Sequence, residues 1–411
     1  MPAATDPALR RATAAVYAAF IAAGFAFASW AARIPQVRDA LELSPRGLGL
    51  VLLAVAVGSV IALPLAGLVV RRLGTERTVA AMAVLAAAGL AIAGVGVEIG
   101  VLPVVVGLFL LGLGNGTWDV AMNVEATDVE RDLGRSIMSR FHAGFSVGTV
   151  AGALAGSVMV ALGVSVTAHL LVVAAVVAVG VPLAVRGFPA RRAHHSPEDG
   201  GEGPAVARNP LLAWTEPRTL LIGVFVFTAA FTEGAGNDWL GVAVIDGYGA
   251  APALGSLTFA VFLAAMTTGR WFGPGLLDRY GRVPTVRALA ALALAGLVLV
   301  VFGGSLPVAI VGSALWGLGI ALGFPVGMSA AGDDPRHAAG RVSVVASIGY
   351  VAFLAGPPLL GFLGDEVGTL RALTVTSGLL AIGLLVSGAL RPLPVGQRGA
   401  REPELAAAAG R

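Results

Sequence analysis

The chain has 411 residues, of which 57% are hydrophobic and 12% are charged, against about 25% charged in a typical soluble domain. Its mean hydropathy is +0.86, so its apolar segments cannot all be buried in one water-soluble core, and we expect them to lie in a lipid bilayer. The absence of cysteine excludes disulfides, zinc–thiolate sites and cysteine nucleophiles. Nucleic-acid binding is not indicated either, because the sequence contains no stripe of basic residues interleaved with aromatic ones.

Twelve apolar segments are long enough to cross a bilayer, which takes about 20 residues of helix. The first of them is long and is followed by many others, so we interpret it as a retained helix and not as a secretory signal. The sequence therefore predicts an all-α membrane protein with twelve transmembrane helices. In chain order, the predicted cores are 13–32, 48–70, 78–97, 102–122, 141–162, 166–185, 219–240, 253–276, 286–303, 307–328, 342–363 and 372–390.

Arginine, which supplies every basic residue of the chain, lies mostly on one side of the predicted helices. If the N-terminus is inside, 22 arginines fall in the inner segments, 4 in the outer loops (Arg33, Arg38, Arg46 and Arg371), and Arg270 falls within a helix. Because inner loops are enriched in arginine, this asymmetry predicts that both termini are cytoplasmic and that the number of helices is even. We expect the bacterial plasma membrane, the cell inner membrane, as its location.

The longest polar stretch separates the predicted helices into six and six. It is rich in Gly, Pro and charge and lacks any periodicity, as expected of a flexible linker. We therefore predict an N-terminal six-helix bundle over 1–186, a cytoplasmic linker over 187–217, a C-terminal six-helix bundle over 218–391 and a cytoplasmic tail over 392–411.

Three short motifs recur in the two halves at nearly the same offset. Gly74 and Gly281 are 207 residues apart, Gly112-Leu113-Gly114 and Gly317-Leu318-Gly319 are 205 apart, and Gly134 and Gly340, each followed by arginine, are 206 apart. A constant offset indicates an internal repeat, here two pseudo-symmetric halves in parallel relation. Transporters built this way bind their substrate between the halves near the bilayer midplane.

These motifs resemble the signature of the major facilitator superfamily, Gly-x-x-x-Asp-Arg-x-Gly-Arg between helices two and three. Both copies depart from it, because Arg71 stands where the acid is expected and Pro274 occupies the leading glycine position of the second copy. More narrowly, the chain is similar to the YbjJ-like branch, distantly related to the fucose–proton symporter. The residues that carry this likeness are Arg33-Ile34-Pro35, Asp119-Val120-Ala121-Met122-Asn123, Phe141-His142-Ala143, Glu233-Gly234-Ala235, Asp238-Trp239 and Gly269-Arg270.

A charged group at the centre of a bilayer costs roughly 2.5–3.5 kcal/mol, so ionisable residues inside the predicted helices are functional candidates. Asp119, Asn115 and Asn123 share one face of the fourth helix. We predict that Asp119 takes part in proton coupling, alone or beside His142 at the start of the fifth helix, and that both asparagines contact substrate. The competing interpretations are that Asp119 pairs with a loop arginine and that His142 only packs.

Glu233, in the seventh predicted helix, is our preferred residue for binding a proton or the substrate. Asn237 follows on the same face and is a predicted substrate contact. Asp238 is either solvated or paired with Arg33 at the outer rim. Counting about 1.5 Å per residue places Asp119 and Glu233 on opposite sides of the midplane, so we expect one to bind and the other to gate.

Trp316 and Tyr350, in helices ten and eleven, are further candidates for substrate contact. An indole near mid-membrane can stack on a sugar or an aromatic solute, but interhelical packing explains it equally well. Five other charged residues fit gating better than substrate contact, since cytoplasmic charges control the inner gate in the superfamily that the chain resembles: Arg72, Arg270, Asp278, Arg279 and Arg341. Gly144, Gly148, Gly152 and Gly156 recur every four residues, which predicts close helix packing.

The function predicted from these features is secondary active transport of a small solute by alternating access, coupled to protons as is usual in that superfamily. The sequence contains no nucleotide-binding motif and indicates no enzyme, metal site or cofactor. The expected partners are the solute, protons and the bilayer, with the protein acting as a monomer. Two alternatives stay open: a receptor or scaffold that does not transport, and efflux of a drug or metabolite by proton antiport.

Overall fold

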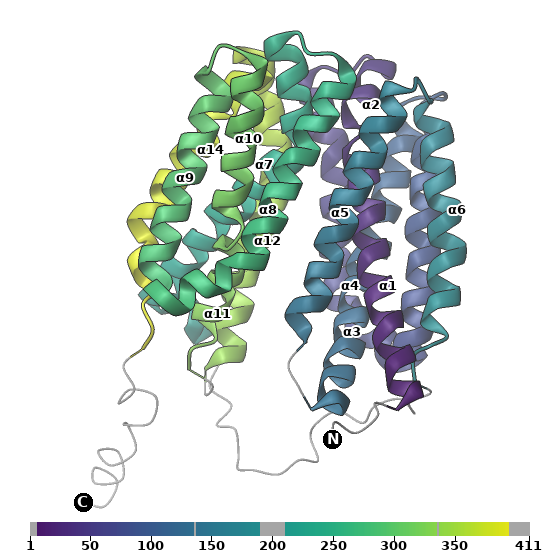
Figure 1. Ribbon diagram of the computed structural model, residues 1–411, viewed down its shortest axis with the longest axis vertical. Helices are drawn as coiled ribbons and strands as arrows, with labels where there is room; N and C mark the ends of the chain where they lie inside the picture. Colours follow the sequence, from purple (N-terminus) through teal and green to yellow (C-terminus); the bar gives the residue numbers. More distant parts are fainter. Residues whose placement is uncertain (1–5, 135–136, 190–209, 335–336, 394–411) are drawn as a thin grey trace, which may run out of the picture.

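The computed structural model describes residues 6–134, 137–189, 210–334 and 337–393. Within these ranges the chain is helical and contains no strand (Figure 1). The N-terminal half comprises α1 Pro7–Ala31, α2 Ile34–Ala40, α3 Pro45–Gly96, α4 Val101–Leu133, α5 Met138–Ala161 and α6 Val166–Val185. The C-terminal half comprises η1 Pro210–Thr215, α7 Pro217–Tyr248, α8 Pro252–Tyr280, α9 Arg282–Phe302, α10 Leu306–Ile320, α11 Gly323–Ala331, α12 Ala338–Val367, α13 Thr369–Ala372, α14 Thr374–Val386 and η2 Ser387–Leu390.

Eleven of these helical stretches are long and apolar enough to span a membrane. The predicted number of twelve spans is reached because α3 accounts for two of them. Its 52 residues include one with non-helical backbone angles, Gly74. The helix therefore turns at this residue and supplies two spans, which match the predicted cores 48–70 and 78–97. The first, tenth and twelfth spans are each made of more than one element: α1 with α2, α10 with α11, and α13 with α14 and η2.

The internal repeat appears in the backbone as well as in the sequence. Gly74 has φ 78° and ψ 166°, and Gly281, at the corresponding turn between α8 and α9, has φ 80° and ψ 168°. Positive φ favours glycine because a Cβ would clash with the backbone. The same residue type thus makes the same turn in both halves.

The two Gly-Leu-Gly motifs also occupy equivalent places. Gly112 of α4 approaches the backbone of α3 before its turn, and Gly114 approaches α3 after the turn. In the other half, Gly317 of α10 approaches α8, and Gly319 approaches α9. A side chain at any of these positions would meet backbone atoms, so each pair lets one helix pack tightly against two neighbours. The prediction of two pseudo-symmetric bundles is confirmed.

The predicted glycine stripe of α5 packs against α1. Cβ atoms placed on Gly148 or Gly152 would overlap the carbonyl oxygens of Ile21 and Phe25, respectively. The stripe therefore lets the two helices approach to backbone contact, as predicted from its spacing.

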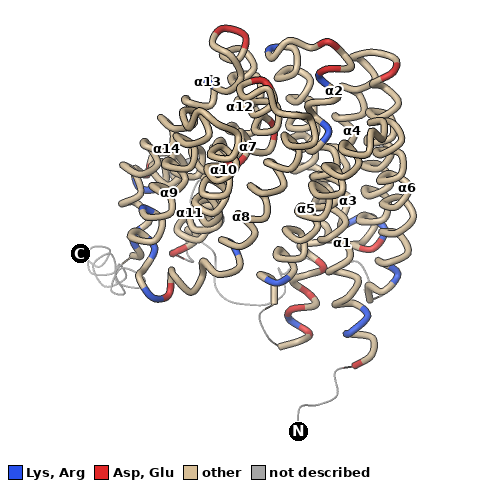
Figure 2. Tube along the Cα trace, turned by 45° about the horizontal axis from the view of Figure 1, so that its top comes forward, with Lys and Arg blue, Asp and Glu red and all other residues tan. Residues whose placement is uncertain are grey.

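The halves lie side by side and differ in how they meet at their two ends (Figure 1). We define the terminal end as the end where α1 begins at Pro7 and η2 ends at Leu390, and the far end as the opposite one, which holds α2 and the α7–α8 connection. In Figure 1 the ribbons of the halves converge at the far end and diverge toward the terminal end. Charged residues gather mostly at the two ends (Figure 2), while exposed apolar side chains such as Val172, Phe272 and Leu385 cover the outer faces of the helices.

Most of the linker predicted over 187–217 and of the tail predicted over 392–411 lies outside the described residues. The end of the linker is described and includes η1.

Candidate functional site

An ion pair lies within the helices of the C-terminal half. Nη2 of Arg270, on α8, is 2.9 Å from both carboxylate oxygens of Glu233, on α7. Both side chains are largely buried, with exposed fractions of 27% for Arg270 and 19% for Glu233. Two opposite charges so placed stabilise each other at a depth where either one alone would be costly.

A break in the tenth span lies next to this pair. The predicted core 307–328 is interrupted after Ile320, and α11 starts only at Gly323. The carbonyl oxygen of Ala321, at the break, lies 3.4 Å from Nε of Arg270. Backbone groups freed by a broken helix need polar partners inside a membrane, and here the guanidinium is one.

Asp119, on α4, approaches the C-terminal half from across the interface. Its carboxylate is exposed, and Asn123 donates from Nδ2 both to its carboxylate, at 3.3 Å, and to its carbonyl oxygen, at 2.9 Å. Among the described residues it has no cationic partner. The charge of Asp119 lies within electrostatic range of Tyr350, on α12 of the other half. Asp119 and Asn123 are thus in contact, and Tyr350 lies in the same region; their role in binding stays a prediction.

His142, on α5, also lies beside the other half, but it does not join Asp119. Its ring is exposed and contacts Phe20 edge-on, with 5.2 Å between ring centroids. It lies within electrostatic range of Arg270. No hydrogen bond or ion pair joins His142 to Asp119 among the described residues, so the interpretation of these two as a contacting pair is not supported.

The helix bounds change the expected depths of the two acids. The count from sequence ended the fourth span near residue 122, but α4 continues to Leu133. Asp119 therefore lies about 21 Å from the terminal end of α4, and Glu233 about 24 Å from the terminal end of α7, at 1.5 Å per residue. The two distances are comparable, so the helix bounds no longer support placing the acids on opposite sides of the midplane.

The other predicted substrate contacts are placed less favourably. Trp316 is fully buried and packs edge-on against Phe262, with 5.1 Å between centroids, which is the packing alternative considered above. Asn115 is partly buried one turn from Asp119. Asn237 lies toward the far end, in a small pocket between the halves.

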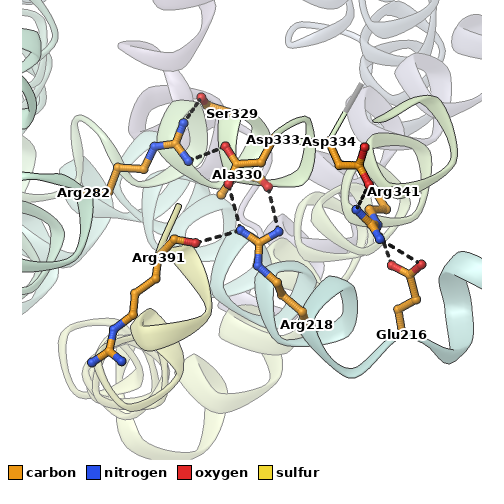
Figure 3. Close-up of polar contacts among 9 residues, drawn as sticks. All are labelled: Glu216, Arg218, Arg282, Ser329, Ala330, Asp333, Asp334, Arg341 and Arg391. Carbon is orange, nitrogen blue, oxygen red and sulfur yellow. Dashed lines mark hydrogen bonds and ion pairs between the residues drawn. The ribbon is translucent and has the colours of Figure 1, made fainter. Parts of the chain in front are cut away.

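A network of ion pairs at the terminal end of the C-terminal half went unrecognised in the sequence (Figure 3). Asp333 accepts from Arg218 at 2.8 Å and from Arg282 at 2.6 Å, joining α7 and α9 to the end of α11. Arg341 of α12 donates to Glu216 at 2.6 Å and to Asp334 at 3.3 Å. All of these contacts stay within one half, so they hold its helices together without joining it to the other half.

Glu216 shows the electrostatic effect of this network. Burial acts to raise its pKa, but hydrogen bonds from Arg341 and Thr219 outweigh burial and hold the pKa below the ordinary value of 4.5. Of the predicted gating residues, Arg341 belongs to the network and Arg270 to the central ion pair. Arg72, Asp278 and Arg279 are exposed at the terminal end, where Arg279 stacks over the Tyr280 ring.

The hydrogen bonds and ion pairs that join the two halves, among the described residues, lie at the far end. Arg38 of α2 pairs with Asp246 of α7 at 2.6 Å, and Asp246 also accepts from Thr369. The remaining contacts are Ser157 Oγ to the Ala253 carbonyl oxygen, Ser256 Oγ to the Ala32 carbonyl oxygen, and the Arg46 amide to Asp365.

Arg33 does not pair with Asp238 at this end, and that alternative is wrong. Arg33 is buried and donates to Nδ1 of His169 at 3.0 Å and to the Val164 carbonyl oxygen at 2.8 Å, both within its own half. It is therefore not the outer-loop arginine that the hydropathy pattern suggested. Its guanidinium is satisfied by neutral acceptors.

The family model of the Major Facilitator Superfamily matches residues 15–350 and 227–408. The chain belongs to the major facilitator superfamily. An uncharacterized MFS-type transporter of Yersinia pestis is 31% identical over 377 residues, which cover 90% of this chain and 92% of that protein. Membership makes this chain a multi-pass membrane transport protein that handles small molecules.

Solved structures of other major facilitator proteins share its fold. A mutant of the nucleoside transporter NupG superimposes with a TM-score of 0.74 at 12% identity, covering 93% of this chain and 99% of that chain. A mutant of the E. coli fucose:proton symporter FucP superimposes with a TM-score of 0.57 at 16% identity, covering 92% of this chain and 98% of that chain. At such identities the likeness concerns the fold alone.

Proposed function

We propose that this major facilitator protein is a proton-coupled secondary transporter whose solute binds between the halves, beside the Glu233–Arg270 pair and Asp119. The observation that carries the proposal is the ion pair itself, at mid-helix and beside a broken tenth span. Transporter sites are typically built from interrupted helices at the midplane. The proposed location is the bacterial plasma membrane, with the arginine-rich terminal end in the cytoplasm.

In this mechanism, Glu233 carries the coupled proton. Protonation removes its charge and thereby releases Nη2 of Arg270, whose donors then become available to the solute. Asp119 and Asn123, from the facing half, supply acceptor and donor groups to the same solute, and Tyr350 supplies a hydroxyl. Such a set favours a polar, hydroxyl-bearing molecule. Proteins of this fold that transport fucose or nucleosides make these two classes the first ones to test.

Alternating access follows from the distribution of contacts between the halves. The far end is held by polar contacts that cross the interface, whereas Asp119 and His142 are exposed nearer the terminal end. This distribution supports an inward-facing state, in which solute exchanges with the cytoplasm. Rotation of the halves would break the far-end contacts and bring the terminal ends together.

The proposal is tested by reconstituting the full chain in proteoliposomes. Fucose, nucleosides and a panel of neutral, anionic and cationic metabolites are first screened for thermal stabilisation of the purified protein, and the ligands found are then assayed for flux. We expect a pH gradient to drive accumulation in the wild type. Glu233→Gln should fold normally but lose gradient-driven accumulation, because a permanently neutral side chain cannot exchange a proton.

Glu98→Gln is the matched control, since Glu98 is an exposed acid outside the site. It should transport as the wild type does. Full gradient-driven accumulation by Glu233→Gln would exclude Glu233 as the proton carrier. A wild type that binds a ligand without moving it would contradict the transport function and favour a receptor.

A further inference from the structure

A small pocket with polar lining lies between the halves at the far end, separate from the Glu233–Arg270 pair. Residues 31, 32, 34 and 35, at the junction of α1 and α2, form one wall. Residues of α7 and α8 form the other, and its polar members are Asn237, Asp238 and Ser256. The space inside admits about one water-sized particle.

The side-chain oxygens of Asn237 and Asp238 in this pocket are acceptors that lack donors among the described residues. Asp238 has no hydrogen-bond or ion-pair partner among the described residues. Oδ1 of Asn237 is buried and accepts no hydrogen bond. Ser256 already donates its hydroxyl hydrogen to the Ala32 carbonyl oxygen at 2.9 Å, so toward other groups it can only accept. Asp238 itself is partly buried. A buried amide oxygen without a donor, next to a partly buried carboxylate, is costly unless a positive species joins them.

The charged groups around the pocket do not supply that species. On the α1–α2 side, Arg33 is turned to His169 and to a carbonyl oxygen of its own half, and Arg38 is engaged by Asp246 and Asp39. On the α8 side, the pocket is lined by Ser256 and Phe259, neither of which is charged. Asp238 is thus left as the single ionisable group of the lining.

We propose that Asp238 and Asn237 bind one small monovalent cation, H⁺ or Na⁺, in this pocket. Oxygen acceptors around a single carboxylate suit both: a proton converts Asp238 into a donor, and Na⁺ is coordinated by the carboxylate and amide oxygens. The inference rests on the proposed transport function, to which it adds a second cation site outside the central one.

The position of the pocket couples the cation to the conformation. Because its walls come from both halves, the site is complete only while the far end is closed. A ligand that binds one conformation better shifts the equilibrium toward it. The bound cation therefore stabilises the closed far end, and its loss favours opening.

The test measures the distance between the two halves at the far end. It uses the full-length chain, which has no native cysteine to interfere with labelling. Spin labels are placed on Ala40→Cys and Ala251→Cys, exposed positions of opposite halves at this end. Their distance distribution in lipid nanodiscs is recorded from acidic to alkaline pH without Na⁺, and then at alkaline pH with NaCl or with choline chloride. We expect the cation to raise the ratio of closed to open molecules by about 5- to 150-fold, the usual range of such couplings.

The two cations give different results. A response to pH alone assigns the proton, and a response to NaCl at constant alkaline pH assigns Na⁺. Asp238→Asn should abolish either response, while Glu42→Gln, which removes an exposed acid at the same end, should preserve it. If Asp238→Asn does not fold, Asn237→Ala keeps the carboxylate and should shift the midpoint to higher cation concentration.

A far end indifferent to both cations would overturn the inference, as would an unchanged response in Asp238→Asn or, where that variant does not fold, an unchanged midpoint in Asn237→Ala. Solute flux through the same wild-type protein is measured in parallel. If the protein transports solute but the far end does not respond to either cation, the proposal of a second cation site is contradicted and the proposed transport function is not.

Discussion

At the scale of single residues, charge within the membrane span is tolerated where a partner neutralises it. Glu233 and Arg270 come from different helices, 37 positions apart, and meet at 2.9 Å. Asp119 has no such counter-charge among the described residues, and its carboxylate accepts a hydrogen bond from the neutral Asn123 amide instead. The two acids therefore differ in how they respond to a proton: protonation of Glu233 frees a cation, whereas protonation of Asp119 removes an isolated charge.

A residue-scale prediction concerns Glu216, whose pKa is held below 4.5. A carboxyl whose pKa is lower in the folded than in the unfolded state stabilises the fold above its unfolded pKa, and this contribution disappears as pH falls through the folded pKa. Glu216→Gln should therefore lower the unfolding temperature in detergent at neutral pH. The difference from wild type should shrink once the pH falls below 4.5.

The control for this experiment is Glu366→Gln, an exposed acid of the far end. Its unfolding temperature should stay close to the wild-type value at neutral pH. A deficit in Glu216→Gln that stayed constant down to acidic pH would show that packing, and not the ion pair with Arg341, causes the loss.

At the scale of helices, glycine decides which pairs pack at backbone distance. Gly148→Leu should separate α5 from α1, because its side chain has no room beside the carbonyl oxygen of Ile21. Overpacking of this kind costs about 1–3 kcal/mol. We expect a clearly lower unfolding temperature and less protein in the membrane fraction. Gly180→Ala, on the open face of α6, has no atom within 4 Å of the new Cβ and should be neutral. Equal stability of the two variants would contradict the packing assignment.

At the scale of the whole molecule, the balance between conformations depends on contacts that cross the halves. Arg38 and Asp246 form such a contact, with side-chain exposures of 12% and 33%. A partly exposed ion pair contributes up to about 1 kcal/mol, so Asp246→Asn should shift the ratio of open to closed far ends by up to about fivefold. The spin-label pair Ala40→Cys and Ala251→Cys measures this ratio.

Asp39→Asn provides the contrast, because Asp39 binds the same arginine from within the same half. It should leave the ratio unchanged. Identical shifts in both variants would mean that Arg38 acts through its local structure and not as a link between the halves.

The local features of the fold were readable from the amino-acid sequence. The lengths of the apolar runs predicted twelve spans, and the repeated glycines predicted two related halves. Both features are local, because the length of an apolar run and the need for glycine at a positive φ depend only on the segment itself. The same reasoning selected Asp119 and Glu233, since a charge in an apolar run is costly wherever it lies. Their expected separation in depth rested on a fourth span ending near residue 122, whereas α4 extends past its apolar core to Leu133.

What the sequence by itself determined, then, was which segments enter the membrane and which of their residues are unusual there. Only the tertiary structure decided the partners: Glu233 with Arg270, Arg33 with His169 and not with Asp238, and the terminal cluster around Asp333. The physical reason is that burial and backbone angles are local properties, whereas an ion pair depends on the rotation and height of two helices distant in sequence. Asp238, which has no partner among the described residues, became visible for the same reason, because a missing partner is a property of the assembled halves.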